Sequence, residues 1–146
     1  NPGIFFTAYS AVVVASRPIA GRWSDRFGRT AVIIPSMAFL GAAMVTLAYT
    51  TSMYGLLWAA VLQGLGFGGV QPAIMALVVD RSTAHDRGPA LATLMGAFDI
   101  GVGLGATGLG LILEHTSFTV MYLYAAGIAF LGAGVFAAAT AWQREK

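Results

Sequence analysis

Apolar residues fill five long stretches of this chain, and short segments between them hold nearly all of the charged residues. Each stretch has about as many residues as an α-helix needs to cross a hydrocarbon core roughly 30 Å thick, which is around twenty. The pattern therefore predicts five membrane-spanning helices, over residues 2–19, 31–49, 54–79, 89–113 and 118–141.

The segments between these stretches are short, as in EHTS at 114–117. Short connections make consecutive helices antiparallel neighbours. Strands exposed to lipid are not expected, because every backbone polar group in hydrocarbon needs a partner within the protein. We therefore predict an all-α fold, a polytopic bundle of transmembrane helices.

Basic residues mark one side of this bundle. They lie in the first connection, the third connection or the C-terminal segment: Arg17, Arg22, Arg26, Arg29, Arg81, Arg87, Arg144 and Lys146. Cytoplasmic segments of membrane proteins carry an excess of Lys and Arg. We expect an integral protein of the plasma (inner) membrane with an external N-terminus and a cytoplasmic tail at 143–146. Five spans with this orientation favour a chain that is a fragment.

The composition excludes several other classes of protein. The chain is 58% hydrophobic and 10% charged, against about 45–50% and 25% in soluble domains. Its net charge of +2 lies in short turns rather than in a basic stripe, which argues against nucleic-acid binding. With no cysteine and two separated histidines, no metal site is expected. No cofactor site and no catalytic constellation are evident, so we expect no enzyme activity.

Two segments resemble a known family. Residues 21–30, GRWSDRFGRT, resemble the cytoplasmic loop signature of the major facilitator superfamily, G-x-x-[SA]-D-[RK]-x-G-R-[RK], with Thr30 replacing a basic residue. Residues 98–105, FDIGVGLG, resemble a [YF]-D-x-G-x-G-x-G stretch in the eleventh helix of drug-efflux-like members. On this alignment the chain corresponds to helices eight to twelve of a fold with two six-helix halves.

The resemblance implies a secondary transporter that works by alternating access, with a site near the membrane midplane between two halves. It implies a small-molecule substrate, coupled protons, a surrounding lipid bilayer and an N-terminal half that supplies the other wall of the cavity. An efflux-like, proton-coupled member is the favoured interpretation. The alternatives are a small structural membrane protein that binds partner helices and a channel subunit.

The loop signature supplies a set of candidate gating residues: Gly21, Asp25, Arg26, Gly28, Arg29, Arg17 and Arg81. The resemblance implies that Asp25 helps to hold the cytoplasmic side closed, with Arg26, Arg29 and Arg81 as candidate donors. The two glycines permit a close backbone approach or a positive φ in a tight turn. The alternative is that the arginines only set topology and anchor the helices at lipid headgroups.

Asp99 is an acidic residue near the middle of the fourth stretch. Acids at this depth are costly and usually face a cavity or a partner. An apolar setting raises the pKa of a carboxyl group, which favours proton uptake near neutral pH. Asp99 is therefore a candidate proton-coupling or substrate site, and the alternative is a neutral side chain that hydrogen-bonds a neighbouring helix.

Glycines and one proline in the third and fourth stretches form another candidate set, for helix packing or a hinge: Gly64, Gly68, Pro72, Gly101, Gly103 and Gly105. Small residues spaced by four let membrane helices approach closely. Pro72 lacks the donor for the carbonyl of Gly68, so a kink is expected there. Gln63 and Gln71 are candidate cavity-lining residues, with interhelical hydrogen bonding as the alternative.

Overall fold

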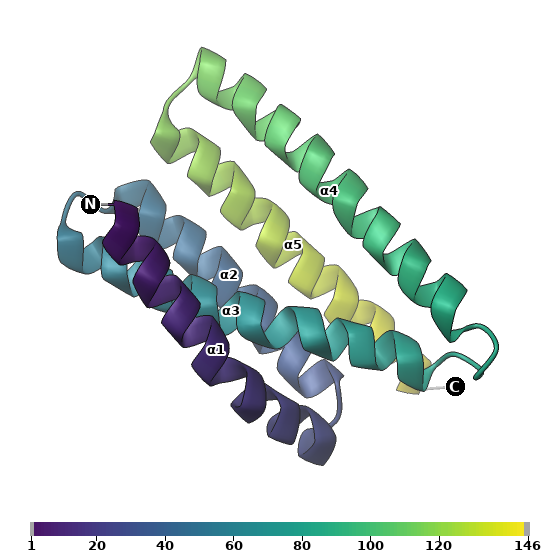
Figure 1. Ribbon diagram of the computed structural model, residues 1–146. Helices are drawn as coiled ribbons and strands as arrows, with labels where there is room; N and C mark the ends of the chain where they lie inside the picture. Colours follow the sequence, from purple (N-terminus) through teal and green to yellow (C-terminus); the bar gives the residue numbers. More distant parts are fainter. Residues whose placement is uncertain (1, 145–146) are drawn as a thin grey trace.

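Residues 2–144 are described by a computed structural model and form five α-helices without a strand (Figure 1). The helices are α1 (Pro2–Phe27), α2 (Thr30–Tyr49), α3 (Met53–Asp80), α4 (Arg87–His115) and α5 (Phe118–Arg144). Each is long and apolar enough to cross a bilayer, so the predicted all-α bundle with five spans is confirmed. Of the tail predicted over 143–146, residues 145 and 146 lie outside the described residues.

Helix α1 continues past the end of its predicted span, from residue 19 to Phe27. Most of the basic segment expected as a turn is therefore helix, and Pro18 lies inside it. The apolar pattern reports the thickness of the hydrocarbon and not the length of the helix. Beyond the hydrocarbon, charged side chains are solvated while the backbone hydrogen bonds of the helix continue.

The turn between α1 and α2 is reduced to two residues, Gly28 and Arg29. Gly28 has φ of 90°, and its N–H donates to the carbonyl of Ser24 at 3.0 Å. A glycine in this conformation ends a helix without the strain that a Cβ would add. The chain then enters α2 at once, which places the end of α1 beside the start of α2.

Helix α3 lies at the centre of the bundle, packed along α1 on one side and α2 on the other (Figure 1). Helix α5 packs along α2, and α4 is outermost, beside α5. The α1–α2 connection, the α3–α4 connection and the end of α5 share one end of the bundle. The basic segments within the described residues therefore gather at one end.

The core consists mainly of small residues, with alanines, glycines and serines buried where helices meet. A Cβ built on Gly64 would lie 2.8 Å from Val12 of α1, and one on Gly66 would lie 2.8 Å from the Ser36 carbonyl of α2. Ile33 is the largest fully buried side chain. Close backbone approach through small residues is how membrane helices gain packing contacts without a hydrophobic driving force between them.

Candidate functional site

Arg29 joins the ends of two helices at the basic end of the bundle. Its Nε donates to Asp80 Oδ2 at 2.8 Å, at the end of α3. Its Nη1 donates to Asp25 Oδ1 at 2.5 Å and to Ser24 Oγ at 3.0 Å, both near the end of α1. One guanidinium thus holds the end of α1, the start of α2 and the end of α3 together. We call Ser24, Asp25, Arg29 and Asp80 the Arg29 cluster.

The local structure explains why these side chains meet. Gly28 ends α1 one residue before Arg29, so Arg29 lies next to the last turn of α1, which carries Ser24 and Asp25. Helix α3 runs unbroken to Asp80, and its last residue reaches the same level. The planar fork of an arginine can donate in two directions at once, which a lysine ammonium does less well.

The cluster is partly shielded on its cationic side. The Arg29 side chain is 25% exposed, whereas those of Asp25 and Asp80 are 70% and 51% exposed. The carboxylates of Asp80 and Asp25, which accept its hydrogen bonds, raise the pKa of Arg29. A raised pKa keeps a cation charged to higher pH, so the contribution of Arg29 is lost only under strongly alkaline conditions. Arg29 therefore keeps the charge that holds the cluster together at every physiological pH.

A small cavity of about 210 Å³ borders the cluster between α1 and α3. Ser24, Asp25 and Arg29 line its polar side, while Pro72 and Ala76 line the α3 side. Gly21 also faces this cavity from within α1, where a Cβ would meet open space. Gly28 has the positive φ expected of a glycine in a tight turn, but Gly21 is helical and needs none.

The other candidate arginines lie outside the cluster. Arg26 stacks its guanidinium over the Phe27 ring, 5.4 Å from the ring centre. Arg81 follows α3 as its C-cap residue. Within residues 2–144, the ion pairs involve Arg29 and neither Arg17 nor Arg81.

Asp80 and Ser24 are the cluster members that the sequence did not single out. Asp80 is next to Arg81 in the sequence, but its ion-pair partner is Arg29, 51 residues earlier. The signal that identifies Asp80 is its position as the last residue of α3, on the same side as the loop signature. Ser24 is only 4% exposed, and it fills the [SA] position of the loop signature, where an alanine would match equally well.

The candidate residues of α3 lie in its packed middle. Gly64 and Gly68 face α1, where Ser16 Oγ lies 3.4 Å from the Gly64 carbonyl and donates to it. Gln63 has a buried Oε1 without a hydrogen-bond partner among the described residues. Pro72 lies inside one continuous helix and lines the small cavity beside the Arg29 cluster.

The candidate residues of α4 lie on an open helix. Asp99 is exposed, and no residue of α4 is buried against the rest of residues 2–144. A Cβ on Gly101, Gly103 or Gly105 would have no neighbour within 4 Å. The described residues therefore bring neither Asp99 nor these glycines into contact with Gln63 or the Arg29 cluster.

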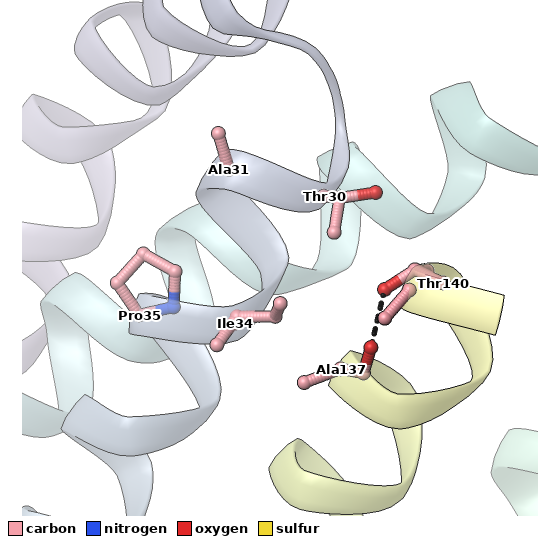
Figure 2. A pocket seen from close by; sticks show the side chains of 7 residues that line it. Thr30, Ala31, Ile34, Pro35, Ala137 and Thr140 are labelled. Atoms are coloured by element: carbon pink, nitrogen blue, oxygen red, sulfur yellow. Dashed lines mark hydrogen bonds between the residues drawn. The ribbon is translucent and has the colours of Figure 1, made fainter. Parts of the chain in front are cut away.

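A further pocket of about 330 Å³ lies between α2 and α5, close to the basic end (Figure 2). Ile34, Pro35 and Ala137 line it, and Thr140 donates its hydroxyl to the carbonyl of Ala137 at 2.9 Å (Figure 2). The hydroxyl of Thr30 also lines the pocket, and the rest of its lining is apolar.

Comparisons with known proteins identify the family. Residues 2–146 match the sequence profile of the Major Facilitator Superfamily. The chain is 37% identical over 89 residues to the bacillibactin exporter of Bacillus subtilis, covering 58% of this chain and 22% of that protein. It is 27% identical over 131 residues to multidrug resistance protein 1 of Bacillus subtilis, covering 90% of this chain and 33% of that protein.

A third relative is the 3-(3-hydroxy-phenyl)propionate transporter of Escherichia coli, 28% identical over 105 residues. The match covers 72% of this chain and 26% of that transporter. No solved structure matches the chain. The chain spans about a fifth to a third of the length of these relatives. Two of them are named as an exporter and a transporter, in agreement with the prediction that the chain is not an enzyme. From the profile match over nearly its whole length, the chain belongs to the Major Facilitator Superfamily.

Proposed function

We propose that this chain forms helices eight to twelve of a transporter that moves a small organic solute across the plasma membrane by alternating access. The Arg29 cluster is the observation that carries the proposal, since it joins the loop signature to the end of α3. The exporter and multidrug names of two relatives favour efflux. In this proposal an N-terminal half, which lies outside the chain, supplies the opposite wall of the cavity.

In the proposed cycle, the Arg29 cluster holds the cytoplasmic ends of α1, α2 and α3 in one arrangement. The basic segments share one end of the bundle, which supports a cytoplasmic location for this end and for the C-terminus. When the two halves rock, α3 has to separate from the α1–α2 connection or move with it. Breaking the Arg29–Asp80 contact is the step that would release α3.

A transport assay with the whole natural protein tests this role. In inverted membrane vesicles, ethidium serves as the fluorescent substrate, chosen because of the multidrug-named relatives. Arg29→Gln keeps a polar side chain but removes the charge that links Asp25 and Asp80. We expect a fall of about tenfold in the transport rate, because about 1.4 kcal/mol of bias between two states changes their ratio tenfold.

The matched control is Arg87→Gln, which removes a positive charge from the same end of the bundle without touching the cluster. The control should transport within twofold of the natural protein. Equal rates for Arg29→Gln and the control, at equal amounts of folded protein, would contradict a gating role for Arg29.

We further propose that Asp99 takes up the coupling proton and that Gln63 and Gln71 line the cavity. Asp99 is the acidic residue within the middle of α4, and Gln63 has a buried carbonyl oxygen free to accept a hydrogen bond from a substrate or water. Acidic and polar side chains within a membrane usually belong to substrate or ion pathways. In the complete transporter that we propose, the open face of α4 leaves room for the proton site at Asp99 and for the cavity.

Asp99→Asn separates coupling from binding, because asparagine keeps the shape and does not titrate. We expect transport driven by a pH gradient to fall more than tenfold, while exchange of labelled for unlabelled substrate without a gradient continues. Glu114→Gln, at the C-terminal end of α4, is the matched control and should retain coupled transport. Undiminished gradient-driven transport by Asp99→Asn would exclude Asp99 as the coupling site.

A further inference from the structure

An apolar groove of about 320 Å³ opens between α1, α2 and α3, on the side of α1 that carries Trp23. Ile19 and Trp23 of α1, Phe39 of α2 and Leu65 of α3 form its walls. Ser16 and Ser36, both buried, lie at its base. Acidic side chains are absent from its lining, so the groove offers an apolar occupant a continuous surface.

The groove has the length and direction of a lipid chain. Along α2 it extends from Ala31 to Phe39, which corresponds to about 12 Å at the rise of an α-helix. One leaflet of a bilayer has a hydrocarbon depth of roughly 15 Å. Because α2 begins at Thr30 at the basic end of the bundle, the groove extends from that surface toward the middle of the membrane.

Two cations that form no salt bridge within residues 2–144 lie near the basic end of this groove. Arg22 and Arg26 follow Ile19 and Trp23 by three residues, so each lies nearly one turn beyond a groove residue, toward the basic end, and about 60° from it around α1. Both are exposed, and within residues 2–144 the ion pairs of carboxylates involve Arg29 and neither of these two. The positive charge at this mouth of the groove is therefore available to an anion.

Aromatic rings fix the position of one of these cations. Arg26 stacks over Phe27, and Phe27 in turn contacts the Trp23 ring with centres 6.0 Å apart. Trp23 is 59% exposed and lines the groove. Tryptophan prefers the headgroup level of a bilayer, which is also the depth of lipid phosphates. The cation at Arg26 is thus held beside the groove at that depth.

We propose that this groove is a binding site for an anionic phospholipid, with one acyl chain between α1, α2 and α3 and the phosphate at Arg22 and Arg26. Basic sites between transmembrane helices at the cytoplasmic surface bind acidic headgroups in this way. A free phosphate would leave the groove empty, and a zwitterionic lipid would bring no net charge to the two arginines. The inference rests on the membrane location of the helices and not on the proposed transport activity.

Quenching of tryptophan fluorescence by brominated lipids tests the proposal in the whole natural protein. The protein is reconstituted in phosphatidylcholine vesicles that contain brominated phosphatidylglycerol or, in parallel, brominated phosphatidylcholine at the same mole fraction. The signal of Trp23 is the difference between the natural protein and Trp23→Phe. We expect half-maximal quenching at a mole fraction at least fivefold lower for the anionic lipid than for phosphatidylcholine. One arginine near an anionic surface contributes about 1 kcal/mol of binding free energy, which corresponds to about this ratio.

Substitutions then assign the preference to the two arginines. The double variant Arg22→Gln/Arg26→Gln should lose the preference for phosphatidylglycerol, whereas Arg87→Gln, the matched control outside the groove, should retain it. Phe39→Trp in the Trp23→Phe background places a second reporter deeper in the groove, and lipids brominated near the chain end should quench it.

Three results would overturn the proposal. Equal quenching of Trp23 by both brominated lipids would mean ordinary contact with surrounding lipid. Absence of quenching by either lipid would mean that another part of the protein covers the groove. A preference that survives in the double variant would mean that the anionic lipid binds elsewhere. The first two results come from the natural tryptophan, so they hold even if the double variant does not fold.

Discussion

Helices α3 and α4 are both rich in glycine, but the structure uses their glycines in opposite ways. The glycines of α3 between 64 and 69 lie against neighbouring helices, so that an added Cβ would collide with side chains or backbone. The glycines of α4 from 96 to 110 face open space within the described residues. A run of small residues therefore allows a close helix approach, but the neighbours of the helix decide whether the approach occurs.

The neighbours differ because α3 is central and α4 is outermost. Helix α3 packs along both α1 and α2, and many of its residues between 59 and 73 are buried. Helix α4 makes few contacts, about equally with α5 and α3, and none of its residues is buried in the described chain. In the complete transporter that we propose, the open face of α4 would meet the cavity or the other half.

The largest difference between the two helices is expected when a bulky residue replaces one glycine in each of them. Gly66→Leu places new atoms against Leu40 and the Ser36 carbonyl, where a Cβ alone would lie 2.7 Å and 2.8 Å away. Overpacking of this kind costs about 1–3 kcal/mol, and a rigid backbone neighbour puts the cost at the upper end. We expect a loss of about 3 kcal/mol in unfolding free energy, measured by denaturation in mixed micelles.

The matched substitution is Gly103→Leu on α4, where a Cβ meets no neighbour within 4 Å. Its effect on the unfolding free energy should stay below about 0.5 kcal/mol, as for surface substitutions elsewhere. A comparable loss at both positions in the whole protein would show that another segment packs against α4 as closely as α1 and α2 pack against α3.

A medium effect is expected at the loop signature, where the same contrast between two glycines appears on a smaller scale. Gly28→Ala puts a Cβ on a residue with φ of 90°, which costs about 1–2 kcal/mol. Gly21→Ala lies inside α1 with open space around it, and it should stabilise the helix by roughly 0.5–1 kcal/mol. Thermal unfolding in detergent should therefore shift in opposite directions for these two variants. Shifts of the same sign would contradict the assignment of Gly28 as the helix-ending residue.

The smallest effect on the unfolding free energy is expected at the contact between α1 and α3. Ser16→Ala removes the hydroxyl that donates to the Gly64 carbonyl at 3.4 Å and leaves the close approach of the helices unchanged. Hydrogen bonds between membrane helices contribute about 0.6 kcal/mol on average, so we expect a loss of about that size. Denaturation of Ser16→Ala beside Ser10→Ala, a change at an exposed serine of the same helix, measures the difference. A loss above about 2 kcal/mol would mean that the hydroxyl, and not the glycine packing, holds α1 to α3.

The sequence predicted the number and kind of helices because the bilayer imposes a length on every apolar stretch. It did not predict where α1 ends, since a helix can continue into the headgroup region after its apolar residues stop. Gly28 was recognisable as a turn residue, but Gly21 carries the same sequence signal inside a helix. The φ at each position depends on which residue ends the helix, and composition does not contain that information.

The Arg29 cluster was only half predictable. Asp25 and Arg29 are four residues apart and belong to one motif, so their contact follows from local geometry. The contact of Arg29 with Asp80 depends on the packing of α3 between α1 and α2 and on the point where α3 ends. That information is distributed over the whole helix, so the loop motif alone does not identify Asp80 as the second partner of Arg29.

The order of glycines along α3 also sets the angular positions of its neighbours. Gly64 and Gly68 meet α1, while Gly66 and Gly69 meet α2. At 100° per residue, the two directions are roughly 150° apart around the axis of α3. One residue inserted between Gly64 and Gly66 would turn the three later glycines by about 100° relative to Gly64, so that Gly64 and Gly68 could no longer face the same helix. The spacing of these four glycines is therefore as important for the arrangement of the helices as their small size.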